Sequence, residues 1–228
     1  MLTEWHARPL LEAYGISGDT GALACSGAEA EAAAKSIGRP VALKVQSANI
    51  LHKTEAGAVA LNIGVDGARA AYERVLANAL RHAPTAQIEG VLVQAMAPAG
   101  RELILGTNRD PRWGPLLMVG LGGVLVEAVR DVALAPAPLD RDAALALLGR
   151  FKGAAILGPY RGLPAADTEA LADLMVKLSQ FAFDHADDIA EIDLNPVIVY
   201  DKGHGVSVVD ALIIKRPRHQ AERRTAAE

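Results

Sequence analysis

Cysteine, aromatic residues and long hydrophobic runs are all scarce in this chain, and each shortage excludes a class of protein. Cys25 is the single cysteine among 228 residues, which rules out an internal disulfide framework and suits a reducing cytosol. The longest uncharged run lies between Arg112 and Glu127, contains four glycines, and is shorter than the roughly 20 apolar residues that a membrane helix needs. We therefore expect neither a disulfide scaffold nor a membrane span.

Secretion and nucleic-acid binding are unexpected as well. The N-terminus carries Glu4, His6 and Arg8 without an apolar core, so we expect no secretory signal and a cytoplasmic location. A net charge of −4 and an aromatic content of 4% leave no basic stripe for a phosphodiester backbone. The hydrophobic content of 51% is typical of a globular enzyme with one large or two small packed units.

The most informative segment runs from Val41 to Val59. Its first six residues alternate in character, which predicts a strand with one face toward a core and Lys44 on the other face. An ammonium in that position needs an anionic partner. The following loop adds side-chain donors at Ser47, His52, Lys53 and Thr54. It also contains Gly57, where the backbone can approach a ligand closely because glycine has no side chain. Together these groups are suited to a polyphosphate.

Helix signals alternate with strand signals along the rest of the chain. Pro9 lies inside an N-terminal helix for which Thr3 is a possible N-cap, so we expect a kink or a start nearer Arg8. A capping box at Ser26–Glu29 begins an alanine-rich helix that ends at Gly38. Three aspartates are predicted to cap later helices, namely Asp66, Asp140 and Asp167.

Strands are predicted on both sides of a break at residues 98–100, which is a candidate hinge between two lobes. The strand before the break covers residues 91–96, and extended structure resumes at residues 102–106. A glycine-rich turn at residues 120–123 either exposes backbone N–H groups to phosphate or serves only as a structural turn. The segments 191–200 and 206–214 predict a β-hairpin.

Three oxygen-bearing side chains in this hairpin suggest a metal site. Asp193 and Asn195 are two residues apart and share a face, while Asp210 interrupts an apolar run and needs a cation or strong donors. In a simple register Asn195 and Asp210 approach each other. A small number of oxygen ligands that are shared with a nucleotide suits Mg²⁺ better than zinc or calcium. For Asp210, a salt bridge is the alternative to a metal.

From Leu10 to Ile214 the sequence resembles the ATP-grasp domain of the nucleoside-diphosphate-forming acyl-CoA synthetases, as in the beta subunit of ADP-forming acetyl-CoA synthetase. A more distant likeness links it to the succinyl-CoA synthetase beta subunit. The resemblance rests on five segments in the family's order: Ala42–Val45, Ile50–Thr54, Gly120–Gly123 with Glu127, Arg161–Gly162 and Glu191–Pro196. It implies an α/β (α+β) fold of the ATP-grasp type, with two lobes and a nucleotide cleft between them.

The resemblance also implies roles for individual residues. Lys44 would hold the phosphates of ATP or ADP, with Lys53 offsetting their charge, and Glu102 would bind the ribose. The adenine hinge would be formed by Gln94, Ala95, Met96 and Ala97. Asn195 and Asp210 would hold Mg²⁺. His52 matches a histidine proposed to relay phosphate, and Asp193 would lie beside a phosphohistidine segment of the partner. A plain hydrogen bond from His52 to the nucleotide is the alternative.

By the same resemblance, the chain interconverts acyl-CoA, ADP and phosphate with acid, CoA and ATP, together with a CoA-binding alpha subunit. Two departures affect the loop after the strand. Ala48 stands where the family usually has proline, and Ala56–Ala58 stands where it usually has two adjacent glycines. We expect one domain over residues 1–228, with lobes at 16–95 and 96–215 and a flexible tail at 216–228. Two alternatives are a detached regulatory nucleotide-binding module and an ATP-grasp ligase that joins a carboxylate to an amine.

Overall fold

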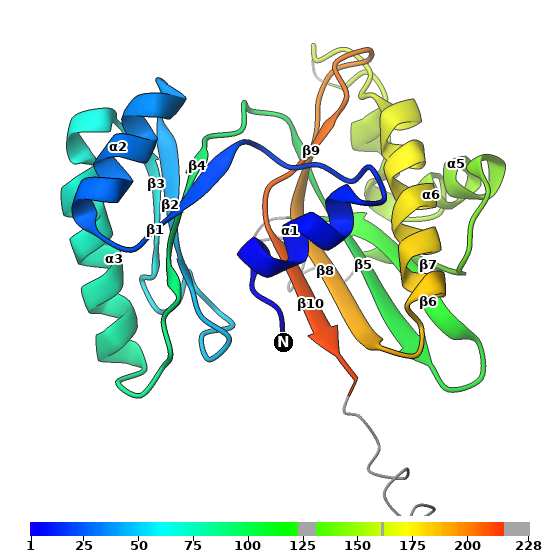
Figure 1. Ribbon diagram of the computed structural model, residues 1–228. Helices are drawn as coiled ribbons and strands as arrows, with labels where there is room; N and C mark the ends of the chain where they lie inside the picture. Colours follow the sequence, from blue (N-terminus) through cyan, green and yellow to red (C-terminus); the bar gives the residue numbers. More distant parts are fainter. Residues whose placement is uncertain (123–130, 161, 217–228) are drawn as a thin grey trace, which may run out of the picture.

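The computed structural model describes residues 1–122, 131–160 and 162–216. Two antiparallel sheets lie on either side of the first helix, α1 (Glu4–Glu12), and each sheet carries helices on its outer face (Figure 1). This arrangement confirms the predicted mixed α/β class. No helix in the described part of the chain has both the length and the apolarity to span a membrane.

The first sheet has four strands in the order β1-β4-β2-β3. In that order they are β1 (Gly21–Ala24), β4 (Gly90–Ala95), β2 (Val41–Gln46) and β3 (Val59–Ile63). Helices α2 (Gly27–Ile37) and α3 (Ala68–His82) cover its outer face (Figure 1). Val41, Leu43 and Val45 lie in the core between this sheet and these helices, as the alternation predicts.

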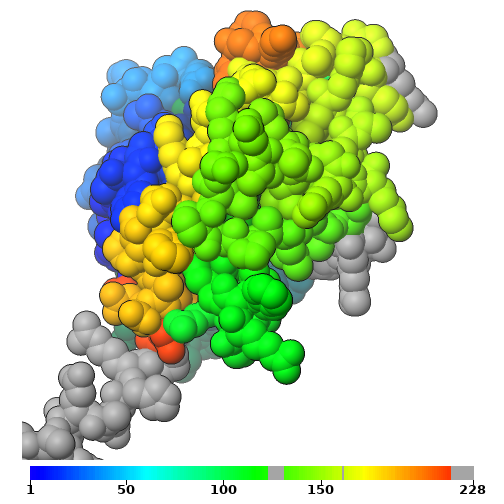
Figure 2. Space-filling model, turned by 90° about the vertical axis from the view of Figure 1, so that its right-hand side faces the viewer, coloured from blue at the N-terminus to red at the C-terminus, as the bar shows by residue number. Residues whose placement is uncertain are grey.

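The second sheet follows the order β10-β8-β5-β6-β7, with β9 paired to β8. Its strands are β10 (Ala211–Lys215), β8 (Ile189–Val199), β5 (Arg101–Asp110), β6 (Gly114–Leu121), β7 (Val132–Pro136) and β9 (Val206–Val208). The outer face carries α5 (Arg141–Leu148), the 3-10 helix η2 (Lys152–Leu157) and α6 (Thr168–Asp184). Figure 2 shows this outer face, with the hairpin of β5 and β6 (green) at its lower end.

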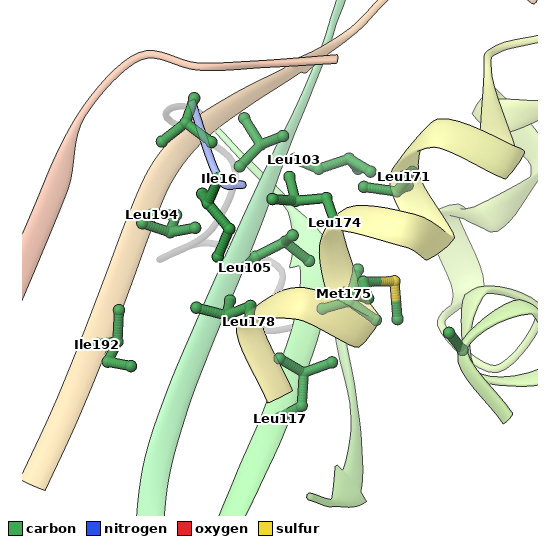
Figure 3. Packing of buried hydrophobic residues seen from close by; sticks show 14 of the residues in the cluster. Ile16, Leu103, Leu105, Leu117, Leu171, Leu174, Met175, Leu178, Ile192 and Leu194 are labelled. Atoms are coloured by element: carbon green, nitrogen blue, oxygen red, sulfur yellow. The ribbon is translucent and has the colours of Figure 1, made fainter. Parts of the chain in front are cut away.

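Helix α6 supplies much of the larger core, as its apolar spacing predicts. Its apolar stripe faces the sheet strands β5 and β6 (Figure 3). The fully or almost fully buried side chains that meet there are Leu171, Leu174, Met175, Leu178, Leu103, Leu105 and Leu117. This packing fixes β5 and β8, and therefore the opposite face of the sheet, which looks toward the first sheet.

Helix α1 differs from the sequence prediction, because it begins at Glu4 and continues through Pro9. Ala7 and Leu11 are buried in the core of the second sheet, and Leu2 bridges to Ile213 of β10, so tertiary contacts hold the turn that precedes the proline. Thr3 occupies the N-cap position, but its hydroxyl contacts the ring of His6 instead of a helix N–H.

Apart from Thr3 and Asp66, the predicted helix caps agree with the structure. Ser26 Oγ accepts from the N–H of Glu29, and Gly38 ends α2 in the left-handed region with φ 70°. Asp140 and Asp167 also cap their helices through side-chain oxygens. Asp66 does not cap α3, because it lies inside a short 3-10 turn at Val65–Gly67 that leads into the helix.

The glycine-rich turn is also placed differently. Gly120 is within β6, and Gly122 donates its N–H to the carbonyl of Glu102. A Cβ at Gly122 would lie 2.7 Å from the backbone carbon of Leu103, so this glycine permits close approach of two strands. The prediction of a turn that begins at Gly120 was wrong, and Gly123 lies outside the described residues.

The two cores do not follow the expected lobe limits in every detail. The strands of the two sheets separate along the chain between Ala95 and Arg101, which spans the candidate hinge. Residues of α1, which precede the first expected lobe, pack with the second core. The limits at residues 95 and 96 stay a prediction, and the expected tail lies outside the described residues except for Arg216.

Candidate functional site

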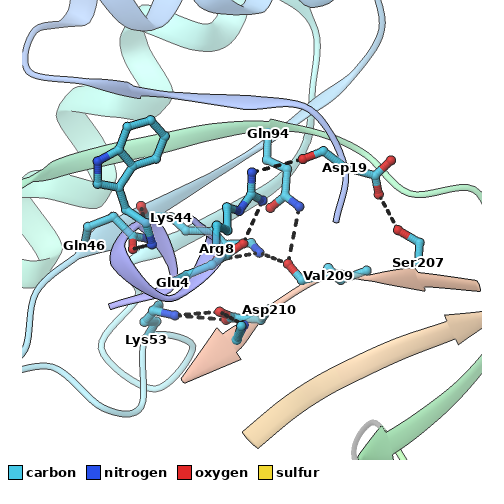
Figure 4. A network of polar contacts seen from close by, with 12 residues as sticks. Glu4, Arg8, Asp19, Lys44, Gln46, Lys53, Gln94, Ser207, Val209 and Asp210 are labelled. Carbon is cyan, nitrogen blue, oxygen red and sulfur yellow. Dashed lines mark hydrogen bonds and ion pairs between the residues drawn. The ribbon is translucent and has the colours of Figure 1, made fainter. Parts of the chain in front are cut away.

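Lys44 lies at the centre of a polar network between the two sheets (Figure 4). Its Nζ donates to Glu4 Oε2 at 3.1 Å and to the carbonyl oxygen of Val209 at 2.6 Å. The Lys44 side chain is 5% exposed and that of Glu4 is 2% exposed. Both faces of β2 are buried, because α1 and the segment before β10 cover the face that carries its polar side chains. Lys44 therefore joins β2, α1 and the second sheet.

Lys53 provides a second link between the sheets. Its Nζ lies 3.0 and 2.9 Å from the two carboxylate oxygens of Asp210, just before β10. Burial raises the pKa of Asp210, but the ammoniums of Lys44 and Lys53 outweigh it and hold that pKa below its usual range. The prediction that Asp210 meets a cation is confirmed, since Lys53 forms a salt bridge with it, and its role as a metal ligand stays a prediction.

Glu4 is the site residue that the sequence analysis missed. It accepts from Arg8 Nη2 at 2.9 Å as well as from Lys44. Burial raises the pKa of its carboxyl, while Lys44 lowers it. One signal was available in the sequence, because Glu4 falls on the same helical stripe as the buried Ala7 and Leu11. A carboxylate on an apolar stripe indicates a buried cation partner.

Asn195 and Asp210 lie side by side where β8 meets β10. The N–H of Asn195 donates to the carbonyl oxygen of Asp210 at 3.2 Å, as the predicted hairpin register requires. Asp193 pairs with Leu212 of β10 and Gly106 of β5. Burial raises the pKa of Asp193 to about 6, and the negative charge of Asp210 adds to this. The three predicted oxygen ligands or acceptors therefore lie on neighbouring positions of one sheet.

A groove continues from Asp193 across the same sheet. It has a volume of about 380 Å³ and is lined by residues of β5, β6, β7 and β8. Its walls are mostly apolar, with Leu116, Met118 and Leu134 on one side and the carboxylates of Glu191 and Asp193 on the other. Asp193 therefore lies at the wall of a groove and not in a closed core.

The expected hinge residues form a connected segment at the end of β4. Gln94 is 1% exposed, and its Nε2 donates to Val209 O at 3.4 Å, whereas its Oε1 has no hydrogen-bond partner among the described residues. The backbone N–H groups of Ala95 and Met96 bond to neighbouring carbonyls. Ala97 is half-buried, and the Glu102 side chain at the start of β5 is exposed. A buried acceptor without a partner fits a ligand donor, because such a group costs free energy when it is left unpaired.

The loop between β2 and β3 holds His52 at the surface, next to Lys53. Two other loop residues serve the fold instead of a ligand. Ser47 is buried and donates to the carbonyl of Gln87 at 2.7 Å. Gly57 has φ +61°, and a Cβ there would lie 2.9 Å from Asn78 Nδ2. The prediction that both residues contribute to a polyphosphate site was therefore wrong. Thr54 is exposed and remains accessible.

Three positions of the family motifs lie outside the described residues, namely Gly123, Glu127 and Arg161. Within the described part of the chain, no group of three or more histidine, cysteine, aspartate or glutamate side chains has the arrangement of a metal site. The network instead combines two ammoniums with carboxylate and carbonyl oxygens. The ammoniums can hold phosphate oxygens, and the carboxylate and carbonyl oxygens are ligands of the kind that Mg²⁺ prefers.

Comparisons with known proteins agree with this geometry. A family model described as an ATP-grasp domain matches residues 1–214. Subunit beta of the ADP-forming acetate–CoA ligase II of Pyrococcus furiosus is 41% identical over 214 residues, covering 93% of this chain and 91% of that subunit. The ADP-forming acetate–CoA ligase I of Archaeoglobus fulgidus is 43% identical over 198 residues, which cover 87% of this chain but 29% of that protein.

A solved structure gives the same result in three dimensions. The acetyl-coenzyme A synthetase 1 of Candidatus Korarchaeum cryptofilum, in complex with coenzyme A, Ca-AMPCP and HgCl⁺, superposes with a TM-score of 0.90 at 42% identity. The match covers 94% of this chain and 93% of that one. The predicted ATP-grasp fold is thereby confirmed. The chain belongs to the ATP-grasp domain family, and within it to the group that includes the beta subunits of ADP-forming acetate–CoA ligases.

Proposed function

We propose that this protein is the nucleotide-binding subunit of an ADP-forming acid–CoA ligase, the acetate-activating type being the best match. It would interconvert acyl-CoA, ADP and phosphate with acid, CoA and ATP. The observation that carries the proposal is the interlobe network in which Lys44, Lys53 and Asp210 converge. Because 41% identity extends over 91% of a beta subunit, this function is favoured over a detached regulatory module or an amide-forming ligase.

The residues fit a magnesium nucleotide. Lys44 and Lys53 supply positive charge for phosphates, and Lys44 has three N–H donors, of which two bond to Glu4 and Val209. Gln94 Oε1 supplies a buried acceptor for an amino group of the base. Asp210 and Asn195 supply oxygen atoms of the kind that Mg²⁺ prefers. When bound, Mg²⁺ would neutralise phosphate charge during transfer, while the lysines orient the phosphates.

A CoA-binding alpha subunit is the proposed partner, and the cytoplasm is the proposed location. The groove next to Asp193 gives a phosphohistidine segment of that partner a place to reach the nucleotide.

His52 is the proposed phosphate relay, because neutral imidazole is a nucleophile near neutral pH and the phosphorylated ring is a good phosphoryl donor. With γ-labelled ATP and the partner present, we expect acid-labile, base-stable label on this chain that His52→Ala abolishes. Label confined to the partner would reject the relay.

Calorimetry with Mg-ADP tests the nucleotide site. We expect Lys44→Ala and Asp210→Asn to weaken binding at least about tenfold, equal to about 1.4 kcal/mol. Lys35→Met, an exposed lysine of α2, is the matched control and should bind as the parent does. If both site variants bind Mg-ADP like the parent, the assignment of this site is wrong.

Co-purification with a CoA-binding subunit tests the proposed partner. Full ligase activity of the pure chain would contradict the need for that partner.

A further inference from the structure

The carboxylate of Asp210 already carries a cation in this structure. Lys53 Nζ contacts both of its oxygens, at 3.0 and 2.9 Å, and the N–H of Ala211 donates to Oδ1 at 2.9 Å. One ammonium thus covers the two oxygens that a metal ion would use. The pair is partly shielded from water, since the Lys53 side chain is 15% exposed and that of Asp210 is 27% exposed. A second cation at the same carboxylate would meet direct repulsion.

The charges around this pair also favour a bound anion over a second cation at Asp210. Lys44, Lys53 and Arg8 are cations, whereas Glu4 and Asp210 are the carboxylates bonded to them. Asp193 is a third carboxylate close to the pair, because, besides burial, the charge of Asp210 raises its pKa and that of Lys53 lowers it. The positive charge next to Asp210 is therefore local and is carried by Lys44 and Lys53, which can attract the phosphates of a nucleotide.

The two lysines differ in how firmly they are held. Lys44 is on a central strand and bonds to two acceptors, one on α1 and one before β10. Lys53 is on the loop between β2 and β3, and its Nζ bonds to Asp210 alone among the described residues. A lysine on a flexible four-carbon stem can exchange one anion for another without moving the fold. Lys53 is therefore the lysine that can leave Asp210.

We propose that Lys53 blocks divalent cations from Asp210 until a nucleotide is bound, when the phosphates draw the ammonium away from the carboxylate. The protein would then take up metal only with nucleotide, never before it. This inference rests on the proposed function, because it assigns an order of binding to the same site. Lys53 would in this way be a positioning residue that couples two ligands.

Electron paramagnetic resonance of Mn²⁺ tests the proposal without any need for catalysis. The full chain is titrated with Mn²⁺, with and without ADP, and the free Mn²⁺ signal gives the bound fraction. Without ADP, we expect Lys53→Met to bind Mn²⁺ at least tenfold more tightly than the parent. Lys53→Arg, which restores a cation on Asp210, and the exposed control Lys35→Met should bind as weakly as the parent.

Two further variants make the result specific. Adding Asp210→Asn to Lys53→Met should remove the new Mn²⁺ binding and so locate it. Lys53→Gln keeps a donor toward Asp210 without its charge, and it replaces Lys53→Met if that variant does not fold. Thermal unfolding of each variant shows whether it is folded.

The outcomes separate this inference from the proposed function. If the parent without ADP binds Mn²⁺ within twofold of Lys53→Met and Lys53→Gln, the block does not exist and the inference is overturned, even if Mg-ADP binds normally. If Mg-ADP fails to bind the parent in calorimetry, the proposed function fails instead. A tenfold Mn²⁺ contrast that depends on Asp210 still supports the block in that case.

Discussion

Replacement of Lys44 should affect both stability and nucleotide binding, and the structure allows the two effects to be separated. Lys44→Met keeps the length of the side chain but leaves Glu4 without one of its two cations. Removing one partner of a buried ion pair costs about 3–5 kcal/mol. Arg8 still neutralises Glu4, and Gln94 still donates to Val209 O at 3.4 Å. We therefore expect a loss of about 3 kcal/mol in the free energy of unfolding at pH 8.

The loss should shrink as the pH falls. Burial already raises the pKa of Glu4, and removing Lys44 takes away the charge that most lowers it. Below that raised pKa the carboxyl of Glu4 is protonated, so no unpaired charge is buried. Stability lost in Lys44→Met at pH 8 should therefore be partly regained at pH 5, relative to the parent at the same pH.

A double-mutant cycle with Glu4→Gln provides the control. Urea unfolding of the parent, both single variants and Lys44→Met/Glu4→Gln should give a coupling energy of at least about 1 kcal/mol. The double variant should regain stability but should still fail to bind Mg-ADP, because it lacks the ammonium. A Lys44→Met variant within about 0.5 kcal/mol of the parent, or strictly additive losses, would refute the reasoning.

The remaining predictions concern the second sheet and its core. Asp210→Asn should lower the pKa of Asp193 from about 6, because it removes a negative charge that raises it; carboxyl carbon NMR measures this, and an unchanged pKa would contradict the proximity. Ionising Asp193 opposes folding, so the contribution of Asp193 to the stability of the parent should fall as pH rises from 3.8 through about 6, and it should fall less in the variant. Gly122→Ala places a Cβ 2.7 Å from the β5 backbone and should lower the melting temperature, whereas Gly64→Ala, with no atom within 4 Å, should not. Leu178→Ala empties a fully buried position and should cost about 2–5 kcal/mol in urea unfolding.

Local signals fixed much of the secondary structure because they act over a few residues. The capping box at Ser26 and Glu29 and the caps at Asp140 and Asp167 bond within one turn, so the sequence suffices to place them. The alternation around Leu43 placed β2 in a core for the same reason. Where a longer-range contact competed, the local signal failed, as at Pro9, where burial of its neighbours extends the helix through a proline.

The sequence by itself also predicted which polar side chains come together between the two sheets. Lys44, Lys53 and Asp210 were identified from residue type, alternation and the family resemblance, and all three meet in one network. Only the tertiary structure decided how they are paired. Glu4 is 40 residues from Lys44 along the chain, and Lys53 is 157 residues from Asp210. Pairing over such distances depends on how α1 and the two sheets pack together, which no local pattern of residues contains.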